Sequence, residues 1–237
     1  MKHFITYGNE KFTESKRRIC KEAEECGWFD SITIYEPKDL EKEFQNKYKD
    51  VLKLPRGGGY WIWRPYILLK KLNEMNENDY LIYVDAGCTI NKKGQQRFYE
   101  YLKLLDDSDE GIISFQMPHK EKYYTTKEIF NYFNVLHNPN ITNTSQIIGG
   151  VLLMKKNNKL MEKIHLFYQV IENNKLLFTD FYNKNQEPYF IDNRHDQSIF
   201  SVIRKLGNPI LLKDETWFHF GDEKSLHYPF WATRKRR

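Results

Sequence analysis

The chain has little cysteine and no long apolar run. These two absences argue against a disulfide-stabilised protein and against a membrane-spanning one. Three cysteines (Cys20, Cys26 and Cys88) in 237 residues are an odd number without the spacing of a metal site. A disulfide framework is therefore not expected, and a reducing compartment is favoured. The longest apolar stretch, 147–154, is far shorter than the roughly 20 residues that cross a bilayer, and the first residues do not read as a signal peptide, so we expect none. We expect a cytoplasmic protein that is soluble or peripheral at a membrane surface.

The chain also has almost no net positive charge outside its last four residues. Lysine and arginine total 37 against 32 acidic residues, and four of the five excess positive charges lie in the last four residues, 234–237. A duplex-binding protein usually carries a basic face across its surface, so no nucleic-acid partner is expected. The basic tail is either solvated or contacts anionic lipid or phosphate, and the second alternative predicts peripheral membrane contact.

Aromatic residues, by contrast, are abundant. The chain has 16 Phe, 16 Tyr and 5 Trp, and its 40% hydrophobic and 29% charged residues lie in the range of globular proteins. A chain of this length buries enough surface to fold without disulfides, and we predict one domain over 1–237 with a short tail at 234–237. Aromatic side chains also stack on sugars and bases.

Short apolar runs alternate with segments of helical periodicity. The predicted strands are 3–7, 31–35, 80–84, 111–115, 147–154 (interrupted by two glycines) and 209–212. The predicted helices are 13–26, a charged surface helix within 38–53, one starting near Pro65, 95–105, 127–136, 157–172 and 195–206, and 56–59 is predicted to be a flexible loop. This alternation predicts an α/β fold with a mostly parallel central sheet flanked by helices, which binds ligands at the carboxyl ends of its strands.

A carboxylate stands at the end of the strand 80–84, where the sequence reads Asp85-Ala86-Gly87. Such a carboxylate is costly to bury unless it is paired, and a hard divalent cation is one suitable partner. The alternative is a structural turn or cap residue. Residues 81–90 resemble the strand with the Asp-x-Asp motif of GT-A glycosyltransferases, although Gly87 replaces the second Asp. Upstream, Arg64-Pro-Tyr-Ile-Leu-Leu resembles the helix that packs under the nucleotide-sugar in those enzymes.

Three later segments carry the same resemblance. Gly149-Gly150 resembles the small-residue turn beside the donor sugar, although two glycines also fit a bulge in a buried strand. Asp196-Gln197 resembles the Asp-Gln pair at a helix start, although Asp196 also fits a helix N-cap. The segment 217–221 resembles the late histidine segment of glycosyltransferase family 8, which makes His219 a possible metal ligand or else a core histidine.

The segment 56–64, Arg-Gly-Gly-Gly-Tyr-Trp-Ile-Trp-Arg, has the spacing of neither a Walker loop nor a dinucleotide fingerprint. Two arginines and three aromatic residues around a glycine loop suit a diphosphate and a stacking ring. The alternative is a surface loop with tryptophans anchored in the core, to which we assign Trp61 or Trp63.

The order of these motifs resembles a minimal single-domain GT-A enzyme, close to small bacterial or large-virus enzymes of surface polysaccharide and more distantly to family 8. The resemblance implies transfer of a sugar from a nucleotide-diphosphate sugar, for which we expect a UDP-sugar, to a hydroxyl of a glycan, glycolipid or glycoprotein. The implied roles are base and ribose binding by Thr6, Tyr7 and Gly8; donor binding by Arg56, Arg64, Asp85, Ala86 and Gly87; sugar or acceptor contact by Gly149, Gly150, His195 and Gln197; catalysis by Asp196; and binding of Mn²⁺ or Mg²⁺ by Asp85 and His219.

Two other functions fit parts of the sequence. A sugar nucleotidyltransferase shares the fold class, but it usually has a glycine-rich phosphate loop with a basic residue where this chain has Gly8-Asn9-Glu10. A non-catalytic glycan- or nucleic-acid-binding module would use the aromatics and the tail. Within the enzyme hypothesis, Asp196 is the general base of an inverting enzyme or a sugar-positioning carboxylate of a retaining one, with Glu187 and Asp192 next in line.

Overall fold

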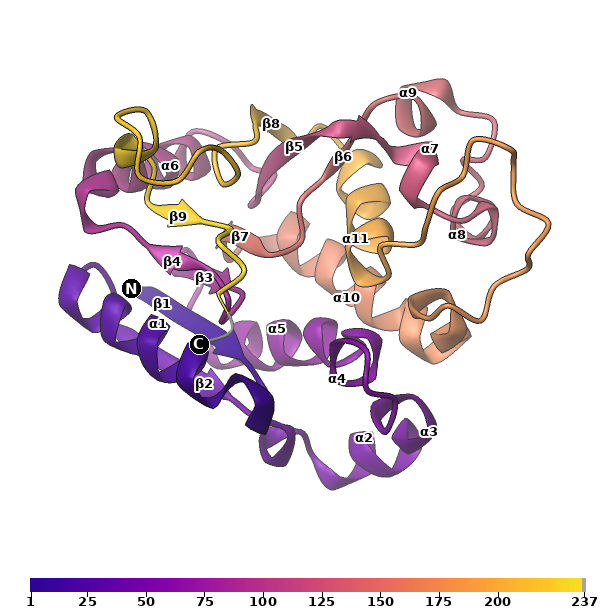
Figure 1. The fold of residues 1–237 in the computed structure, drawn as a ribbon, viewed down its shortest axis with the longest axis horizontal. Coiled ribbons are helices and arrows are strands. Elements are labelled where there is room, and N and C mark those ends of the chain that lie inside the picture. The colour runs from indigo at the N-terminus through magenta and orange to yellow at the C-terminus, as the bar shows by residue number, and fades with distance from the viewer. Residues whose placement is uncertain (236–237) are drawn as a thin grey trace.

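The central sheet has four strands in the order β2–β1–β3–β7. The structure, a computed structural model, describes residues 1–235. Strand β1 (Lys2–Tyr7) pairs in parallel with both β2 (Ser31–Tyr35) and β3 (Tyr80–Val84), and β7 (Val151–Lys155) runs antiparallel to β3. The predicted α/β fold with a mostly parallel sheet flanked by helices is confirmed, and β1 and β3 end at the same edge (Figure 1).

A second sheet has the order β6–β5–β8. Strand β5 (Ile113–Lys120) pairs antiparallel with β6 (Ser145–Ile147) and parallel with β8 (Ile210–Lys213). A bridge between Ile112 and Met154 joins this sheet to β7. A two-stranded ribbon of β4 (Thr89–Ile90) and β9 (Phe230–Trp231) brings the end of the chain beside the segment that follows β3.

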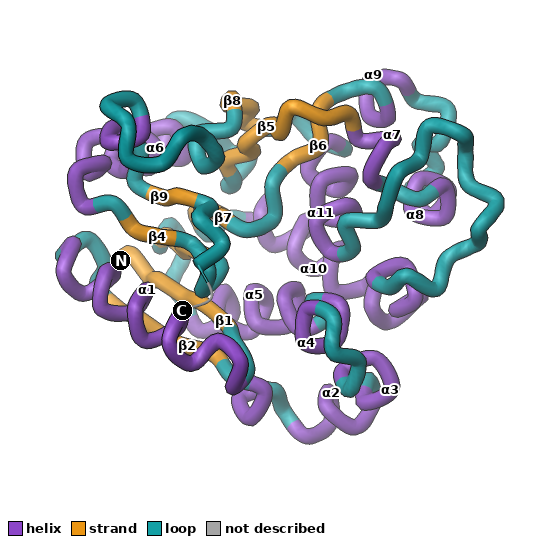
Figure 2. Tube along the Cα trace, in the orientation of Figure 1, coloured by secondary structure: helices purple, strands orange, loops and turns teal. Residues whose placement is uncertain are grey.

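Helices cover both faces of the central sheet. Alternate strand residues such as Phe4 and Ile82 pack with α1 and α6, whereas Ile5 and Leu81 pack with α5, α10 and α11. This alternation follows from the period of two in a strand. The helices are α1 (Thr13–Cys26), α2 (Lys42–Lys47), α3 (Lys49–Leu52), α4 (Gly57–Tyr60), α5 (Trp63–Glu74), α6 (Gln95–Asp106), α7 (Glu121–Tyr124), α8 (Lys127–Tyr132), α9 (Pro139–Thr142), α10 (Asn158–Asn174) and α11 (Asp196–Lys205) (Figure 2).

The prediction of one surface helix within 38–53 is wrong. The chain forms a 3₁₀ turn and then α2 and α3, because Leu40 is extended and Tyr48 departs from helical angles. These breaks turn Phe44, Tyr48 and Val51 into the core, where each is buried. Burial of three large apolar side chains outweighs the continuity of one exposed helix.

The predicted strand 147–154 is two strands in different sheets. Residues up to Ile147 belong to β6 and those from Val151 belong to β7, and the two glycines make the change of sheet. Two boundaries also move: β5 continues to Lys120, and α8 stops at Tyr132, shortly before Asn134 at φ 56°. A positive φ at a non-glycine residue ends a right-handed helix.

Candidate active site at the carboxyl ends of the strands

Arg64 joins the two acidic residues that the sequence singled out. It lies in the first turn of α5 and is 3% exposed. Its Nη2 donates to Asp85 Oδ1 at 2.7 Å, and its Nη1 pairs with Asp196 Oδ2. The Tyr83 hydroxyl donates to the same Asp85 oxygen at 2.5 Å. The ends of β3, α5 and α11 therefore meet at one buried guanidinium.

The two carboxylates differ in exposure. The Asp85 side chain is 40% exposed, whereas that of Asp196 is 5% exposed. Burial raises the pKa of Asp196 to about 6, against the opposing effect of Arg64. Asp85 therefore faces the solvent side of the site, and Asp196 lies behind Arg64, where its charge is costly.

Asp196 does not act as the helix cap that was the structural alternative for it. His195 occupies the N-cap position of α11, without a side-chain capping bond, and Asp196 is the first helical residue. Its carboxylate reaches Arg64 across 132 residues of sequence. A carboxylate in a first helical turn also interacts favourably with the helix dipole.

Gly149 and Gly150 allow three segments to meet at the site. The Asp85 N–H donates to the Gly150 carbonyl at 2.9 Å, and a Cβ on Gly150 would lie 2.8 Å from Asp85 Oδ2. The Gly149 N–H donates to Gln197 Oε1 at 3.0 Å, and a Cβ there would lie 3.4 Å from Arg64 Nη1. The glycines thus remove atoms that would push the carboxylate and the guanidinium apart.

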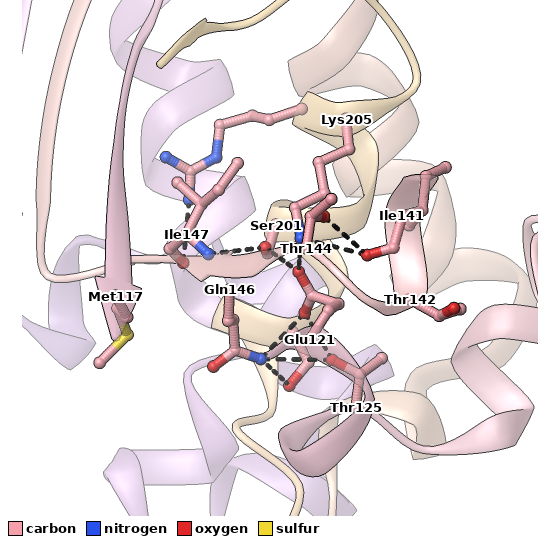
Figure 3. A network of polar contacts seen from close by, with 12 residues as sticks. Met117, Glu121, Thr125, Ile141, Thr142, Thr144, Gln146, Ile147, Ser201 and Lys205 are labelled. Atoms are coloured by element: carbon pink, nitrogen blue, oxygen red, sulfur yellow. Dashed lines mark hydrogen bonds and ion pairs between the residues drawn. The ribbon is translucent and has the colours of Figure 1, made fainter. Parts of the chain in front are cut away.

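Gln197 is bonded to a buried polar network around Gln146 and Glu121, and Figure 3 shows that network. Gln197 Nε2 donates to Gln146 Oε1 at 2.8 Å, and Gln146 Nε2 donates to Glu121 Oε1 at 3.0 Å. Glu121 is fully buried and also accepts from Lys205 Nζ at 2.5 Å and from the Ser201 hydroxyl. Fully satisfied buried networks of this kind hold side chains in one arrangement.

A second ionic cluster, which the sequence did not reveal, borders the site. His195 Nε2 lies 2.9 Å from Asp180 Oδ1, and Arg56 Nη1 donates to Asp180 Oδ2 at 2.8 Å. The Tyr60 hydroxyl donates to the same Asp180 oxygen at 3.0 Å. Burial lowers the pKa of His195, against the opposing effect of Asp180. Arg56 is therefore paired here and with Asp192, and no contact joins it to Asp85 within the described chain.

The predicted flexible loop at 56–59 forms part of a tight left-handed turn. Five consecutive residues have positive φ: Gly57 59°, Gly58 60°, Gly59 95°, Tyr60 52° and Trp61 58°. A Cβ on Gly59 would lie 2.7 Å from the Leu52 Cα, so the glycine is needed for both space and conformation. Non-glycine residues in this region are strained, and such strain concentrates at functional sites. Trp63 is the buried tryptophan, and Trp61 packs partly exposed against the core.

The end of β1 carries a stacked aromatic pair beside a cavity. The rings of Tyr7 and Trp63 are stacked with centroids 3.7 Å apart. Tyr7 also lines a cavity of about 140 Å³. The other lining residues are Asn9, Pro37, Leu40, Gln45, Leu52 and Gly58. Thr6 is fully buried, and its hydroxyl has no partner within residues 1–235; the Gly8 carbonyl accepts from Lys16 Nζ at 3.0 Å.

Other parts of the chain donate hydrogen bonds to the backbone carbonyls of Ala86 and Gly87. The Ala86 carbonyl accepts from Arg18 Nη2 at 3.0 Å. The Gly87 carbonyl accepts from the Lys235 N–H at 2.8 Å and from the Thr233 hydroxyl at 3.1 Å. The last described residues of the chain therefore pack against the position where the Asp-x-Asp motif has its second acid.

The residues at this position do not form a set of metal ligands. No cluster of three or more His, Cys, Asp or Glu residues suited to a metal ion occurs within residues 1–235. Asp85 Oδ1 already accepts from Arg64 and Tyr83, and Gly87 offers no side-chain oxygen. His219 is exposed, and in the part of the chain that the structure describes it belongs to no cluster of possible metal ligands with Asp85. Hard divalent cations are usually held by several oxygen ligands, so these residues do not fit one.

Comparisons with known proteins place the fold. No protein-family model matches the chain, and no curated protein matches it. A crystal structure of a glycosyltransferase involved in glycosylation of the major capsid of PBCV-1 is similar at 14% identity and TM-score 0.54, covering 97% of this chain and 92% of that one. Mouse xyloside xylosyltransferase 1 matches at 10% identity and TM-score 0.49 over 98% and 97%, and the galactosyltransferase LgtC at 12% and 0.48 over 95% and 83%. The chain therefore has a fold similar to that of the PBCV-1 glycosyltransferase, in agreement with the GT-A fold that its sequence resembles.

Proposed function

We propose that this protein is a glycosyltransferase that uses a nucleotide-diphosphate sugar. The observation that carries the proposal is Arg64 paired with both Asp85 and Asp196 at the carboxyl ends of the strands, on a GT-A-type fold. Ligands of open α/β sheets bind at this edge. The exposed Asp85, held in place by the buried Arg64, would offer a charged acceptor to the hydroxyls of a sugar.

The donor would extend from the end of β1 to the two glycines. We place the nucleobase, with uracil as the expected base, in the cavity beside Tyr7, where an aromatic ring supports stacking. The diphosphate would cross the segment from Asp85 to Gly87, and the sugar would lie against Gly149 and Gly150. This order follows the path from β1 to β3 and then to the turn before β7.

Asp196 would act by holding Arg64 rather than by meeting the acceptor directly. Its carboxylate is 5% exposed and already bonded to the guanidinium, so it has little access to a hydroxyl proton. Gln197, fixed through Gln146, would line the face of the sugar next to the glycines. The geometry favours a sugar-positioning role for Asp196 over a general-base role.

The acceptor would bind beside the segment 179–194, which connects α10 to α11. Three large apolar side chains are exposed there: Phe181, Tyr189 and Ile191, at 62%, 43% and 63%. The segment reaches the donor site through the contact of Asp180 with His195. Exposed rings next to charged groups suit a glycan, glycolipid or glycoprotein acceptor with free hydroxyls.

Membrane contact through the tail stays a proposal. No helix within the described residues is long and apolar enough to cross a bilayer. Two of the four basic tail residues, 236 and 237, lie outside the described residues. The backbone of Arg234 and Lys235 packs beside Gly87 while both side chains are exposed, so within the described residues these side chains would make any contact with anionic lipid.

A thermal-shift screen of nucleoside diphosphates and nucleotide sugars tests the donor site. We expect at least one to raise the melting temperature, because a ligand that binds the folded state alone stabilises it by mass action. Asp85→Ala should lose most of that shift. Asp109→Ala, which removes an exposed carboxylate at the other end of the sheet, should keep it. The same shift in Asp85→Ala and wild type, or no shift with any compound, would contradict the proposal.

The raised pKa of Asp196 predicts that kcat/KM falls at acid pH. Because the pKa is about 6, the carboxyl loses its charge as the pH falls through 6 and keeps it above. The protonated form no longer pairs ionically with Arg64, so kcat/KM should fall about tenfold for each pH unit below about 6. Steady-state rates from pH 4.5 to 8 measure this. The Asp196→Asn variant should not show this fall in kcat/KM at acid pH. A wild-type kcat/KM that stays constant down to pH 4.5 would show that the charge of Asp196 has no role in the reaction.

A further inference from the structure

The second acid of the Asp-x-Asp motif is absent, and the backbone of Arg234 and Lys235 packs beside its position. A Cβ built on Gly87 would lie 3.4 Å from the Lys235 carbonyl oxygen and 3.5 Å from the Arg234 Cα. These distances are ordinary van der Waals contacts, so the backbone of residues 234–235 packs directly beside the position from which a second Asp side chain would extend.

The tail is held at this position by several independent contacts. The Ser15 hydroxyl donates to the Lys235 carbonyl at 3.0 Å, and the Lys235 N–H donates to Gly87. The hydroxyls of Thr89 and Thr233 lie 2.9 Å apart. Pairing of β4 with β9 brings the chain to this point. Because these contacts involve α1, the turn after β3 and β4, they fix where the two charged side chains of the tail begin.

Those two side chains are positive and exposed. Arg234 places its guanidinium over the Trp217 ring, 4.9 Å from the centroid, and no carboxylate pairs with Arg234 or Lys235 within residues 1–235. Other cations nearby are already engaged: Arg64 with two carboxylates, and Arg18 with Glu22 and the Ala86 carbonyl. Among residues 1–235, the basic side chains beside Gly87 that have no carboxylate partner are therefore those of Arg234 and Lys235.

We propose that Arg234 and Lys235 bind the donor diphosphate in place of a divalent metal. The inference rests on the proposed glycosyltransferase function and concerns what offsets the charge of the diphosphate. Guanidinium and ammonium groups donate charge-assisted hydrogen bonds to phosphate oxygens, and Arg does so with two parallel donors. In this arrangement Asp85 Oδ1 keeps its bonds to Arg64 and Tyr83.

Calorimetric titration of the full chain with UDP, GDP and inorganic pyrophosphate tests this inference. Each titration is run once with EDTA and once with Mn²⁺. We expect a diphosphate to bind in EDTA, and Mn²⁺ to change its affinity by less than threefold. Arg234→Gln and Lys235→Gln should each weaken binding about tenfold, the scale of one hydrogen bond to a charged group.

Lys159→Gln is the matched control. It removes a partly exposed positive charge from α10, at the opposite end of the central sheet, where Lys159 pairs with Asp109. Its affinity for each probe should equal that of the wild type. Melting temperatures of all three variants establish that they are folded.

Each outcome decides between the alternatives. Binding that needs Mn²⁺ and vanishes in EDTA would overturn the inference and leave the proposed function standing. Equal affinity in Arg234→Gln, Lys235→Gln and Lys159→Gln would overturn the role of the tail. Failure of all three probes to bind in either condition would overturn both the inference and the donor site on which it rests.

Discussion

Asp196→Asn should lower kcat by about 10²-fold or more, the scale of losing a close charge at a reacting centre. The neutral amide can still accept a hydrogen bond from Arg64, but it no longer balances the guanidinium charge or holds it in one orientation. Arg64 would then pair with Asp85 alone, and it would no longer hold that exposed carboxylate in the position from which it meets the sugar. Steady-state rates at saturating donor measure the loss.

The matched control is Glu14→Gln, which removes another first-turn carboxylate from an exposed position on α1. Its kcat should stay at the wild-type value. Asp196→Asn should melt a few degrees lower, because Arg64 keeps one carboxylate partner. A folded Asp196→Asn variant with full kcat would direct the search to Glu187 and Asp192, and to Asp180 beside His195.

Glu121→Gln is expected to give the largest loss of stability. Glu121 is fully buried and pairs with Lys205, whose side chain is 6% exposed. Removing one partner of a buried ion pair costs about 3–5 kcal/mol, because the other charge is left uncompensated. For a chain of this length that corresponds to a melting temperature lower by about 10 °C. Thermal unfolding followed by circular dichroism measures it.

Two further variants separate the charge effect from the loss of one carboxylate. Glu172→Gln breaks an exposed pair with Lys47 and should cost less than about 1 kcal/mol. The double variant Glu121→Gln with Lys205→Met removes both charges and should recover part of the loss. A Glu121→Gln protein as stable as Glu172→Gln would show that the network in Figure 3 contributes little.

The residues at the strand ends were accessible from the sequence because their signals are local. A continuous apolar run followed by Asp85, and a glycine pair before another run, place both at sheet edges whatever the rest of the chain does. The structure brings Arg64, Asp85, Gly149, Gly150, Asp196 and Gln197 together. Their catalytic and binding roles remain predictions.

Other features depend on contacts that leave no periodic pattern. Asp180 lies in an irregular segment. It belongs to the site because its carboxylate binds His195 and Arg56, which are distant from it in sequence or in another element. The tail reaches Gly87 across 148 residues because β4 and β9 pair, and each of these strands has only two residues. The break in 38–53 arose because burial of Phe44 and Tyr48 outweighed local helix propensity.

Release of nucleoside diphosphate from a panel of nucleotide sugars, with mixed glycan and glycolipid acceptors, tests the central claim most directly. The account predicts that one sugar nucleotide is consumed in step with product formed on an acceptor. It also predicts that Arg64→Lys, which keeps the charge but loses the two-pronged contact to Asp85 and Asp196, lowers the rate at least tenfold. Turnover in Arg64→Lys equal to wild type, or no release from any sugar nucleotide by the folded protein, would contradict it.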